Sequence, residues 1–117
     1  MDIQQFTALI QKLCQEQMQP NLLRYETDVP DYRFGIPDKY VAVSFEQNNT
    51  STIFEFRVGL TTLLIDKFNQ LPGANAVNHA TSKDMFKVTI NNDNFSQEIM
   101  NIIEKSCLKA ISRFFQS

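Results

Sequence analysis

Two carboxylates and one cation in the first half of the chain follow one another in the order that metal-dependent cleavage of a phosphodiester uses. Asp38 follows Pro37 at the start of a predicted strand, and Glu55 lies shortly before Arg57 on the next predicted strand. Two carboxylates can hold a Mg²⁺ ion while a nearby cation orients the attacking water. This order of residues makes nuclease chemistry one hypothesis.

The third residue of that pattern favours a plainer interpretation. Nucleases of the PD-(D/E)xK kind carry a lysine there, whereas this chain carries Arg57, which cannot act as a base and prefers a bidentate ion pair. Glu55 and Arg57 fall on the same side of a strand, because side chains alternate between its faces. An exposed pair of neighbours explains the pattern better, so a PD-(D/E)xK-like nuclease is only a remote alternative.

Histidine and cysteine are too scarce for other catalytic or metal chemistry. The chain has one histidine, His79, and two cysteines, Cys14 and Cys107. Both cysteines fall near the apolar stripes of predicted helices, so we expect buried free thiols, and His79 falls in a predicted surface loop. These residues cannot supply a structural zinc site, and the glycines are isolated turn residues rather than a phosphate-binding loop. We therefore predict no catalytic residue, no metal, no cofactor and no enzymatic activity.

A small group of basic residues makes nucleic acid a second candidate ligand. Lys83 and Lys87 lie close in sequence to His79 and Phe86, and a lysine beside an aromatic ring can neutralise a phosphate while the ring stacks on a base. The formal net charge of −2 supplies no overall basic field, and Phe86 is a core residue by alternation. His79, Lys83 and Lys87 are the candidate binding residues, and a solvated polar face is the plainer interpretation.

The elements that must position these side chains are organised around a closing strand and helix. Phe86, Val88 and Ile90 alternate with polar residues, which predicts a strand with one buried face. Asn94, with Gln97 three residues later, predicts the N-terminal cap of the helix that follows. The apolar stripe of that helix comprises Phe95, Ile99, Ile102, Ile103, Cys107, Ala110, Ile111 and Phe114.

Three further apolar residues make this stripe wider than one packing contact requires. Met100, Leu108 and Phe115 extend it to more than half of the helix circumference. If the N-terminal helix does not cover them, they form an apolar ridge for a second copy of the chain or a partner protein. We take them as candidate interface residues, with a complete monomer core as the equally weighted alternative.

The remaining elements complete an α+β domain. In chain order they are a helix between Asp2 and Pro20, an edge strand over 23–27, hairpin strands over 41–46 and 53–58, a helix over 60–71 and a polar loop over 74–84. Each hairpin strand has one apolar face, as is typical of an antiparallel sheet with one side in water. We predict the order α-β-β-β-α-β-α, with the N-terminal, middle and C-terminal helices packed on one face of the sheet.

Length and composition indicate one ordinary globular domain over residues 1–117. Apolar residues make up 43% and charged residues 21% of the chain, which is usual for such a domain. No segment has the length and apolarity of a membrane span, and the N-terminus lacks the pattern of a signal peptide. We therefore predict a cytoplasmic protein that does not enter a membrane.

The segment 34–110 combines several short patterns. They are Phe34-Gly35 before the hairpin, LTTLLIDKFNQLPGANA with Val77-Asn78-His79 and Lys83 after it, the strand FKVTI and the helix SQEIMNIIEKS. Together they resemble the MmcQ/YjbR-like family of small bacterial proteins. The family has a His-Trp pair where this chain has Met85-Phe86, and a proline in place of Arg33. The resemblance implies a double-wing α+β fold, sometimes labelled DNA-binding, without an established activity.

These observations favour a small non-enzymatic interaction module that acts by surface binding, either to itself as a homodimer or to a partner protein. One alternative is a nucleic-acid-binding regulator of the MmcQ/YjbR type. Another is a dedicated chaperone or immunity-type partner, which would use the acidic run over 26–38 against a basic protein.

Overall fold

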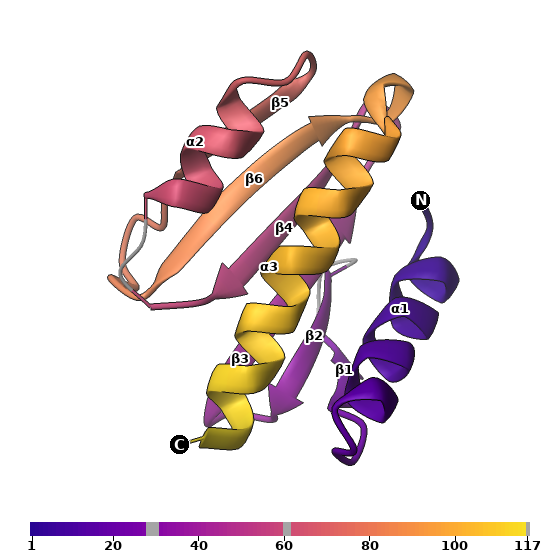
Figure 1. The fold of residues 1–117 in the computed structure, drawn as a ribbon, viewed down its shortest axis with the longest axis vertical. Helices are drawn as coiled ribbons and strands as arrows, with labels where there is room; N and C mark the ends of the chain where they lie inside the picture. The colour runs from indigo at the N-terminus through magenta and orange to yellow at the C-terminus, as the bar shows by residue number, and fades with distance from the viewer. Residues whose placement is uncertain (28–30, 60–61, 117) are drawn as a thin grey trace.

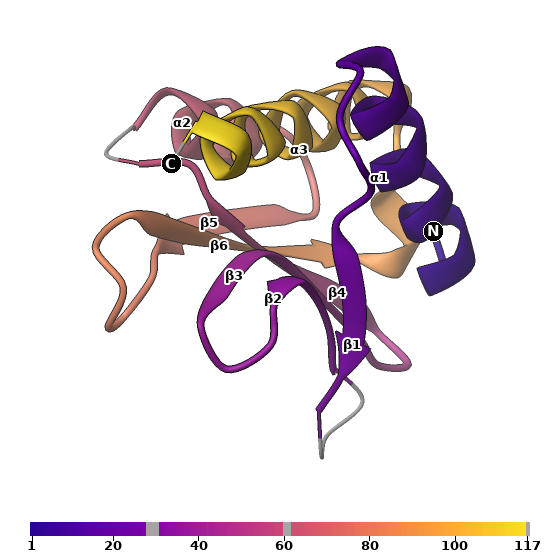
Figure 2. The ribbon, with the colours of Figure 1, turned by 90° about the horizontal axis from the view of Figure 1, so that it is seen from below.

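The computed structural model describes residues 1–27, 31–59 and 62–116, which form an antiparallel sheet with α-helices on one of its faces (Figure 1). The six strands stand in the order β1-β2-β3-β4-β6-β5. In chain order the elements are α1 (Ile3–Glu16), β1 (Leu23–Glu26), β2 (Asp31–Ile36), β3 (Tyr40–Gln47), β4 (Ser51–Arg57), α2 (Leu63–Asn69), β5 (Ala74–Asn78), β6 (Met85–Asn91), the 3-10 turn η1 (Asn92–Asn94) and α3 (Gln97–Gln116). Figure 2 shows α1, α2 and α3 on the same side of the sheet, so the predicted α+β class and helix placement are confirmed.

The sheet contains two strands that the sequence analysis does not predict. β2 falls within a stretch broken by Pro30, Gly35 and Pro37, and β5 replaces the start of the predicted polar loop. β5 is an edge strand in which Ala76 alone is buried, so it lacks the alternating buried apolar residues by which strands are recognised. The element order is therefore α-β-β-β-β-α-β-β-α, which keeps the predicted elements in their predicted sequence and adds β2 and β5 to them.

The core is built from phenylalanines that face the helices. Phe6 of α1 is fully buried, and its ring centroid lies 5.6 Å from that of Phe34, 5.3 Å from Phe45 and 5.1 Å from Phe54. These three partners come from β2, β3 and β4. One side chain of α1 therefore contacts three neighbouring strands. The antiparallel pairing of β3 with β4 confirms the predicted hairpin.

The helices begin with different kinds of cap. Asp2 accepts a hydrogen bond from the Gln5 backbone N–H at 2.8 Å while the Gln5 side chain accepts one from Asp2 at 2.9 Å, which confirms Asp2 as a cap. The cap predicted at Asn94 is wrong, because that residue lies in the 3-10 turn and the Ser96 hydroxyl accepts from the Ile99 N–H at 3.2 Å. None of the helices in the described segments is long and apolar enough to cross a membrane.

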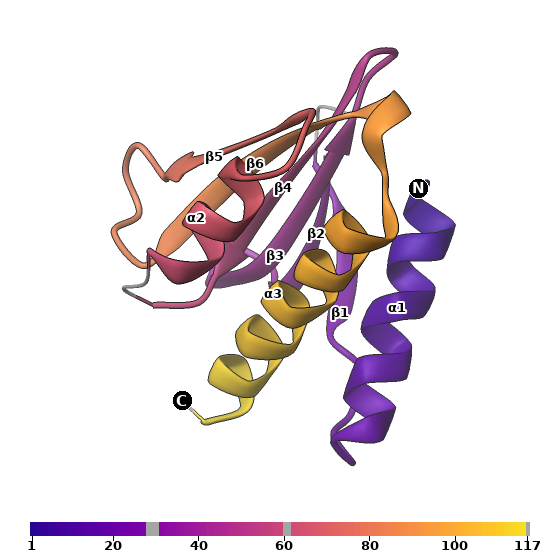
Figure 3. The same cartoon turned by 45° about the horizontal axis from the view of Figure 1, so that its top comes forward.

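α1 and α3 lie side by side across the sheet (Figure 3). Cys14 and Cys107 are both buried free thiols, as predicted. The predicted start of the middle helix at Leu60 lies outside the described residues, and that helix ends at Asn69. The closing strand has Phe86, Val88 and Ile90 on its buried face, as the alternation predicts.

A glycine shapes the passage from β2 to β3. The register between the two strands shifts between Phe34 and Gly35, and Gly35 has a φ of +153°. A Cβ atom at this position would lie 2.2 Å from the carbonyl oxygen of Tyr40. Only glycine therefore allows β3 to approach β2 this closely.

We expect Gly35→Ala to lower the free energy of unfolding by more than about 3 kcal/mol, because it adds a backbone clash to an unfavourable φ. Gly59→Ala is the matched control: Gly59 has a φ of +88°, but the nearest side-chain atom is 3.8 Å from an added Cβ. That variant should lose about 1 kcal/mol. Urea unfolding of both variants measures the difference, and equal losses would contradict the proposed close approach.

Candidate functional site

The sheet has two edges, and the hydrogen-bond phase of the ladder determines what each edge exposes. In an antiparallel pair, residues alternate between those that bond to the neighbouring strand and those whose backbone groups point away from it. The Thr27 N–H donates to the Asp31 carbonyl at 3.2 Å, which fixes this phase for β1 and β2. Arg24 and Glu26 therefore direct their N–H and C=O groups away from β2, and both residues are exposed.

The opposite edge of the sheet, at β5, is capped over its first three residues. The Asn69 side chain in α2 donates to the Ala76 carbonyl at 2.9 Å and accepts from the Ala76 N–H at 2.7 Å. The Ala74 N–H donates to the Leu71 carbonyl at 3.4 Å. The outward N–H and C=O of Ala76 and the outward N–H of Ala74 are thus satisfied by the segment that precedes β5. No comparable cap is present on Arg24 and Glu26 among the described residues. We call their outward backbone the β1 edge.

A depression lies on each side of the β1 edge. The inner depression, of about 400 Å³, lies between α1 and β1 and has Ile10, Leu22 and Phe34 in its lining. The outer depression, of about 670 Å³, has Tyr25 and Tyr40 in its lining. A strand placed along the edge would alternate its side chains between the two depressions, because side chains of a strand point alternately to its two faces.

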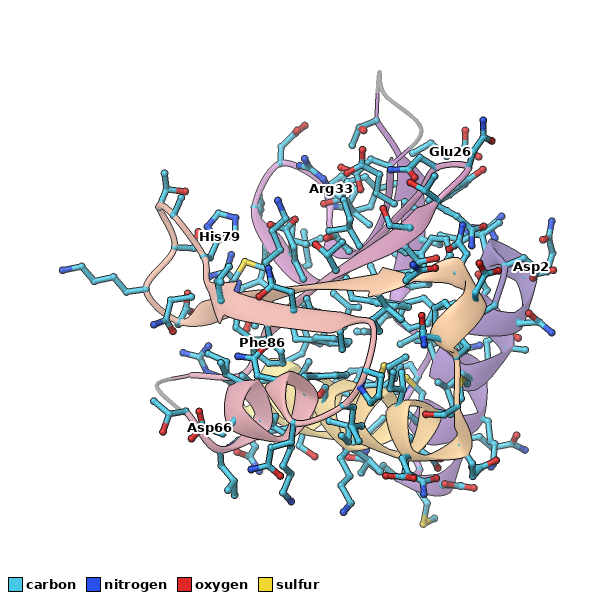
Figure 4. The ribbon with its side chains drawn as sticks, turned by 90° about the horizontal axis from the view of Figure 1, so that it is seen from above. Asp2, Glu26, Arg33, Asp66, His79 and Phe86 are labelled. Carbon is cyan, nitrogen blue, oxygen red and sulfur yellow. The ribbon has the colours of Figure 1, made fainter. Side chains whose placement is uncertain are left out.

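The outer depression carries charges of both signs. The charged side chains that line it are Glu26, Asp38, Arg33, Lys39 and Arg57. Asp31 of the predicted acidic run is paired with Arg33 at 3.2 Å, and Asp28 lies outside the described residues. The surface is therefore mixed, and not acidic as the sequence suggests. Figure 4 shows Glu26 and Arg33 in the part of the sheet that lies farthest from α2 and α3. The pairing of Glu26 with Tyr32 and of Arg33 with Tyr25 directs these two side chains to opposite faces of β1 and β2.

The residues of the nuclease hypothesis have other partners. Asp38 and Arg57 line the outer depression, whereas Glu55 accepts a hydrogen bond from Ser44 at 2.8 Å and pairs with His79 at 2.8 Å. Within residues 1–27, 31–59 and 62–116, no cluster of three or more His, Cys, Asp or Glu is arranged to hold a metal ion. We therefore do not carry the nuclease hypothesis further.

The structure brings two of the three predicted basic residues together around one carboxylate. His79 follows β5 and its Nε2 lies 2.8 Å from Glu55, while Lys87 stands directly opposite Glu55 in the register of β4 and β6. Lys83 lines a separate depression of about 510 Å³. Phe86 is 1% exposed and lies between the sheet and α2 (Figure 4), so its ring cannot stack on a base. Nucleic-acid binding by the other three residues stays a prediction.

Burial is the main influence on the pKa values of the two cysteine thiols and of the Tyr25 hydroxyl. Burial raises the pKa of the Cys14 thiol, and it raises the pKa of the Cys107 thiol well above its ordinary value, so neither is a ready thiolate nucleophile. Burial also raises the pKa of Tyr25 against the opposing effect of Arg33, which keeps its hydroxyl neutral. Ser44, Glu55 and His79 form a hydrogen-bonded chain, but the serine contacts the carboxylate rather than the imidazole, so the histidine is not placed to activate it.

The predicted interface residues of α3 are mostly covered. Met100 and Phe115 are partly buried against the core, and Leu108 is 36% exposed. Met100 lines an apolar groove of about 370 Å³ with Leu9 of α1. The ridge is therefore narrower than the sequence indicates, and a role for these residues in an interface stays a prediction.

Asp84 ties the loop before β6 to the sheet and to α3. Its carboxylate accepts hydrogen bonds from Arg57 and, at 2.9 Å, from Arg113, and its carbonyl accepts from Val58 and Gly59. Burial raises the pKa of Asp84, but the two arginine hydrogen bonds outweigh burial and hold the pKa below its ordinary value of 3.8. The Arg57 side chain that lines the outer depression is thereby held in place.

We expect Asp84→Asn to lower the free energy of unfolding at neutral pH by about 2 kcal/mol, since it weakens two charge-assisted hydrogen bonds. A carboxyl with a lowered folded pKa contributes stability that is fully present above its unfolded pKa. The difference from the wild type should therefore shrink as the pH falls below about 4. Asp66→Asn, on exposed α2 surface, is the control and should change stability by less than about 0.5 kcal/mol. Urea unfolding across pH checks this, and a pH-independent difference would contradict it.

The backbone of Arg24 and Glu26 is the feature that sequence reasoning missed. The alternation over 23–27 predicts an edge strand there, but the direction of its free backbone groups depends on pairing with β2, which was not predicted. The pairing of His79 with Glu55 was missed as well, because it joins a loop to a strand 24 positions earlier in the chain.

Comparison with known proteins gives one structural likeness. No family model matches the chain, and no curated protein matches its sequence. The fold is similar to that in the crystal structure of the Yersinia pestis type III secretion chaperone SycH in complex with a stable fragment of YscM2, with a TM-score of 0.41 and 14% identity over 92% of this chain and 98% of that chain. A likeness at this level does not carry a function from one protein to the other. The resemblance to the MmcQ/YjbR-like family stays a prediction.

Proposed function

We propose that this protein is a non-enzymatic binding module that takes up an extended segment of a partner protein as an additional strand along β1. The observation that carries the proposal is the contrast between the two sheet edges. Asn69 caps Ala76 at the β5 edge, whereas Arg24 and Glu26 at the β1 edge direct uncapped donors and acceptors to the surface. An uncapped edge of this kind is a template for strand pairing.

An extended polypeptide matches this edge better than other ligands do. Its backbone presents donors and acceptors at the spacing of Arg24 and Glu26, and such main-chain bonds supply affinity in strand addition. Its alternate side chains would enter the inner and outer depressions, which would supply specificity. The inner depression combines apolar residues such as Leu22 and Leu23 with polar ones such as Gln11, which suits a partly apolar side chain, whereas the mixed charges of the outer depression suit a polar one.

This mode of binding agrees with the coarse expectation of an interaction module and with the dedicated-chaperone alternative, in which the ligand is a second protein. Nucleic acid is less well matched. The net charge is −2, and of the candidate basic residues His79 and Lys87 lie beside the Glu55 carboxylate. A polyanion would meet that carboxylate together with the lysine.

A proline at position 24 tests the proposal. Arg24→Pro removes an N–H that points away from β2, so the pairing of β1 with β2 should survive while the edge loses a donor. The ligands are peptides selected from a displayed random library on the full-length chain. We expect Arg24→Pro to weaken their binding, measured by fluorescence polarisation, by about ten-fold or more.

Arg24→Ala is the matched control, because it removes the side chain and its contact with Thr7 but keeps the backbone N–H. It should bind within about three-fold of the wild type. Equal binding by Arg24→Pro, a library that yields no binding peptide, or a dimer joined through β1 in sedimentation would each overturn the proposal. Circular dichroism of the proline variant establishes that it is folded.

A further inference from the structure

Two turns in this protein use a side-chain acceptor in the same way, although their backbones close differently: the Asn48 N–H donates to the Ser51 carbonyl, and the His79 N–H donates to the Met85 carbonyl. The Asn48 Oδ1 atom accepts hydrogen bonds from the N–H groups of Thr50 at 2.9 Å and Ser51 at 2.8 Å, and from the Thr50 hydroxyl at 3.0 Å. The sequences of the two turns are Asn48-Asn49-Thr50-Ser51 and His79-Ala80-Thr81-Ser82. The second turn therefore places a histidine where the first has an asparagine.

The histidine ring takes over the role of the amide oxygen. His79 Nδ1 accepts from the Thr81 N–H at 3.2 Å and the Ser82 N–H at 3.0 Å, and it lies 3.3 Å from the Thr81 hydroxyl. A ring nitrogen that accepts two N–H groups carries a lone pair and no proton. The ring proton must then be on Nε2, which lies 2.8 Å from the Glu55 carboxylate. The structure thus holds His79 as one neutral tautomer.

Protonation of the ring is incompatible with this turn. A proton on Nδ1 would face the two N–H donors of Thr81 and Ser82, so those hydrogen bonds must break. The bond from Nε2 to Glu55 can persist and becomes an ion pair. Glu55 is the charged side chain that contacts the ring; the other charged residues of the same strands and segment are Arg57 on β4, Lys87 on β6, and Lys83 and Asp84 in the segment of His79. The opening of the turn therefore follows from the loss of the acceptor for the two N–H groups.

We propose that the turn 79–82 is a pH-sensitive element, in which protonation of His79 releases the backbone N–H groups of Thr81 and Ser82. The segment freed in this way leads to Asp84, whose carboxylate and carbonyl hold Arg57, Arg113 and the end of β4. Acidification would loosen that attachment. The equivalent turn at Asn48 lacks a titratable acceptor and does not respond.

Nuclear magnetic resonance of the full-length chain tests this between about pH 8 and about pH 5, the range in which histidine changes charge. At the upper end, the ring ¹⁵N shifts should show the Nε2–H tautomer. On protonation of His79, exchange of the Thr81 and Ser82 amide protons, corrected for the intrinsic effect of pH, should accelerate about ten-fold or more. The amides of Thr50 and Ser51 in the same molecule are the internal control and should keep their protection.

His79→Asn is the matched variant, since asparagine supplies the same acceptor at Asn48 and does not titrate. Its Thr81 and Ser82 amides should stay protected at both ends of the pH range. Glu55→Gln keeps the Nδ1 acceptor and should retain the pH response. An Nδ1–H tautomer, protected amides after His79 has titrated, or a response that persists in His79→Asn would each overturn the proposal. If His79→Asn does not fold, the comparison of the two wild-type turns and the Glu55→Gln variant decide the question.

Discussion

Burial of one phenylalanine-rich face of the sheet is the constraint on which the rest of the structure depends. Phe6 reaches Phe34, Phe45 and Phe54 on three successive strands, so α1 is fixed over the first half of the sheet. Phe86 packs against Phe68 of α2, with ring centroids 6.1 Å apart, which fixes α2 over the second half. All three helices lie on this face, so among the described segments no helix covers the other face of the sheet or the β1 edge.

The same arrangement makes the two edges unequal. α2 lies beside β5 and contributes Asn69, whose amide satisfies the outward N–H and C=O of Ala76. β1 follows α1, and within the described residues the hydrogen bond that joins these two elements runs between side chains, from Arg24 to Thr7. An exposed edge is a liability for aggregation unless it is short or charged. β1 is four residues long and carries the charged residues Arg24 and Glu26, so it is protected against aggregation although its outward backbone groups are free to pair.

Local patterns predicted those parts of the fold in which one apolar face meets the core. Phe54, Phe56, Phe86 and Val88 alternate clearly, and the hairpin and the closing strand were predicted from them. β2 and β5 were missed because they are an interrupted strand and a polar edge strand, stabilised by pairing rather than by an apolar face. The candidate site depends on that pairing. The outward direction of backbone groups and the meeting of His79 with Glu55 arise only when distant segments come together, and no spacing along the chain reveals them.

Amide hydrogen exchange of the free protein tests the central claim most directly: the β1 edge is open, whereas the opposite edge is capped at Ala76 of β5. The Arg24 and Glu26 N–H groups should exchange about a hundred-fold faster than that of Ala76, which is bonded to Asn69, and that of Tyr25, which points towards β2. Arg24 and Glu26 amides as slow as those of Tyr25 and Ala76 would show that the β1 edge is already covered, and would contradict the account.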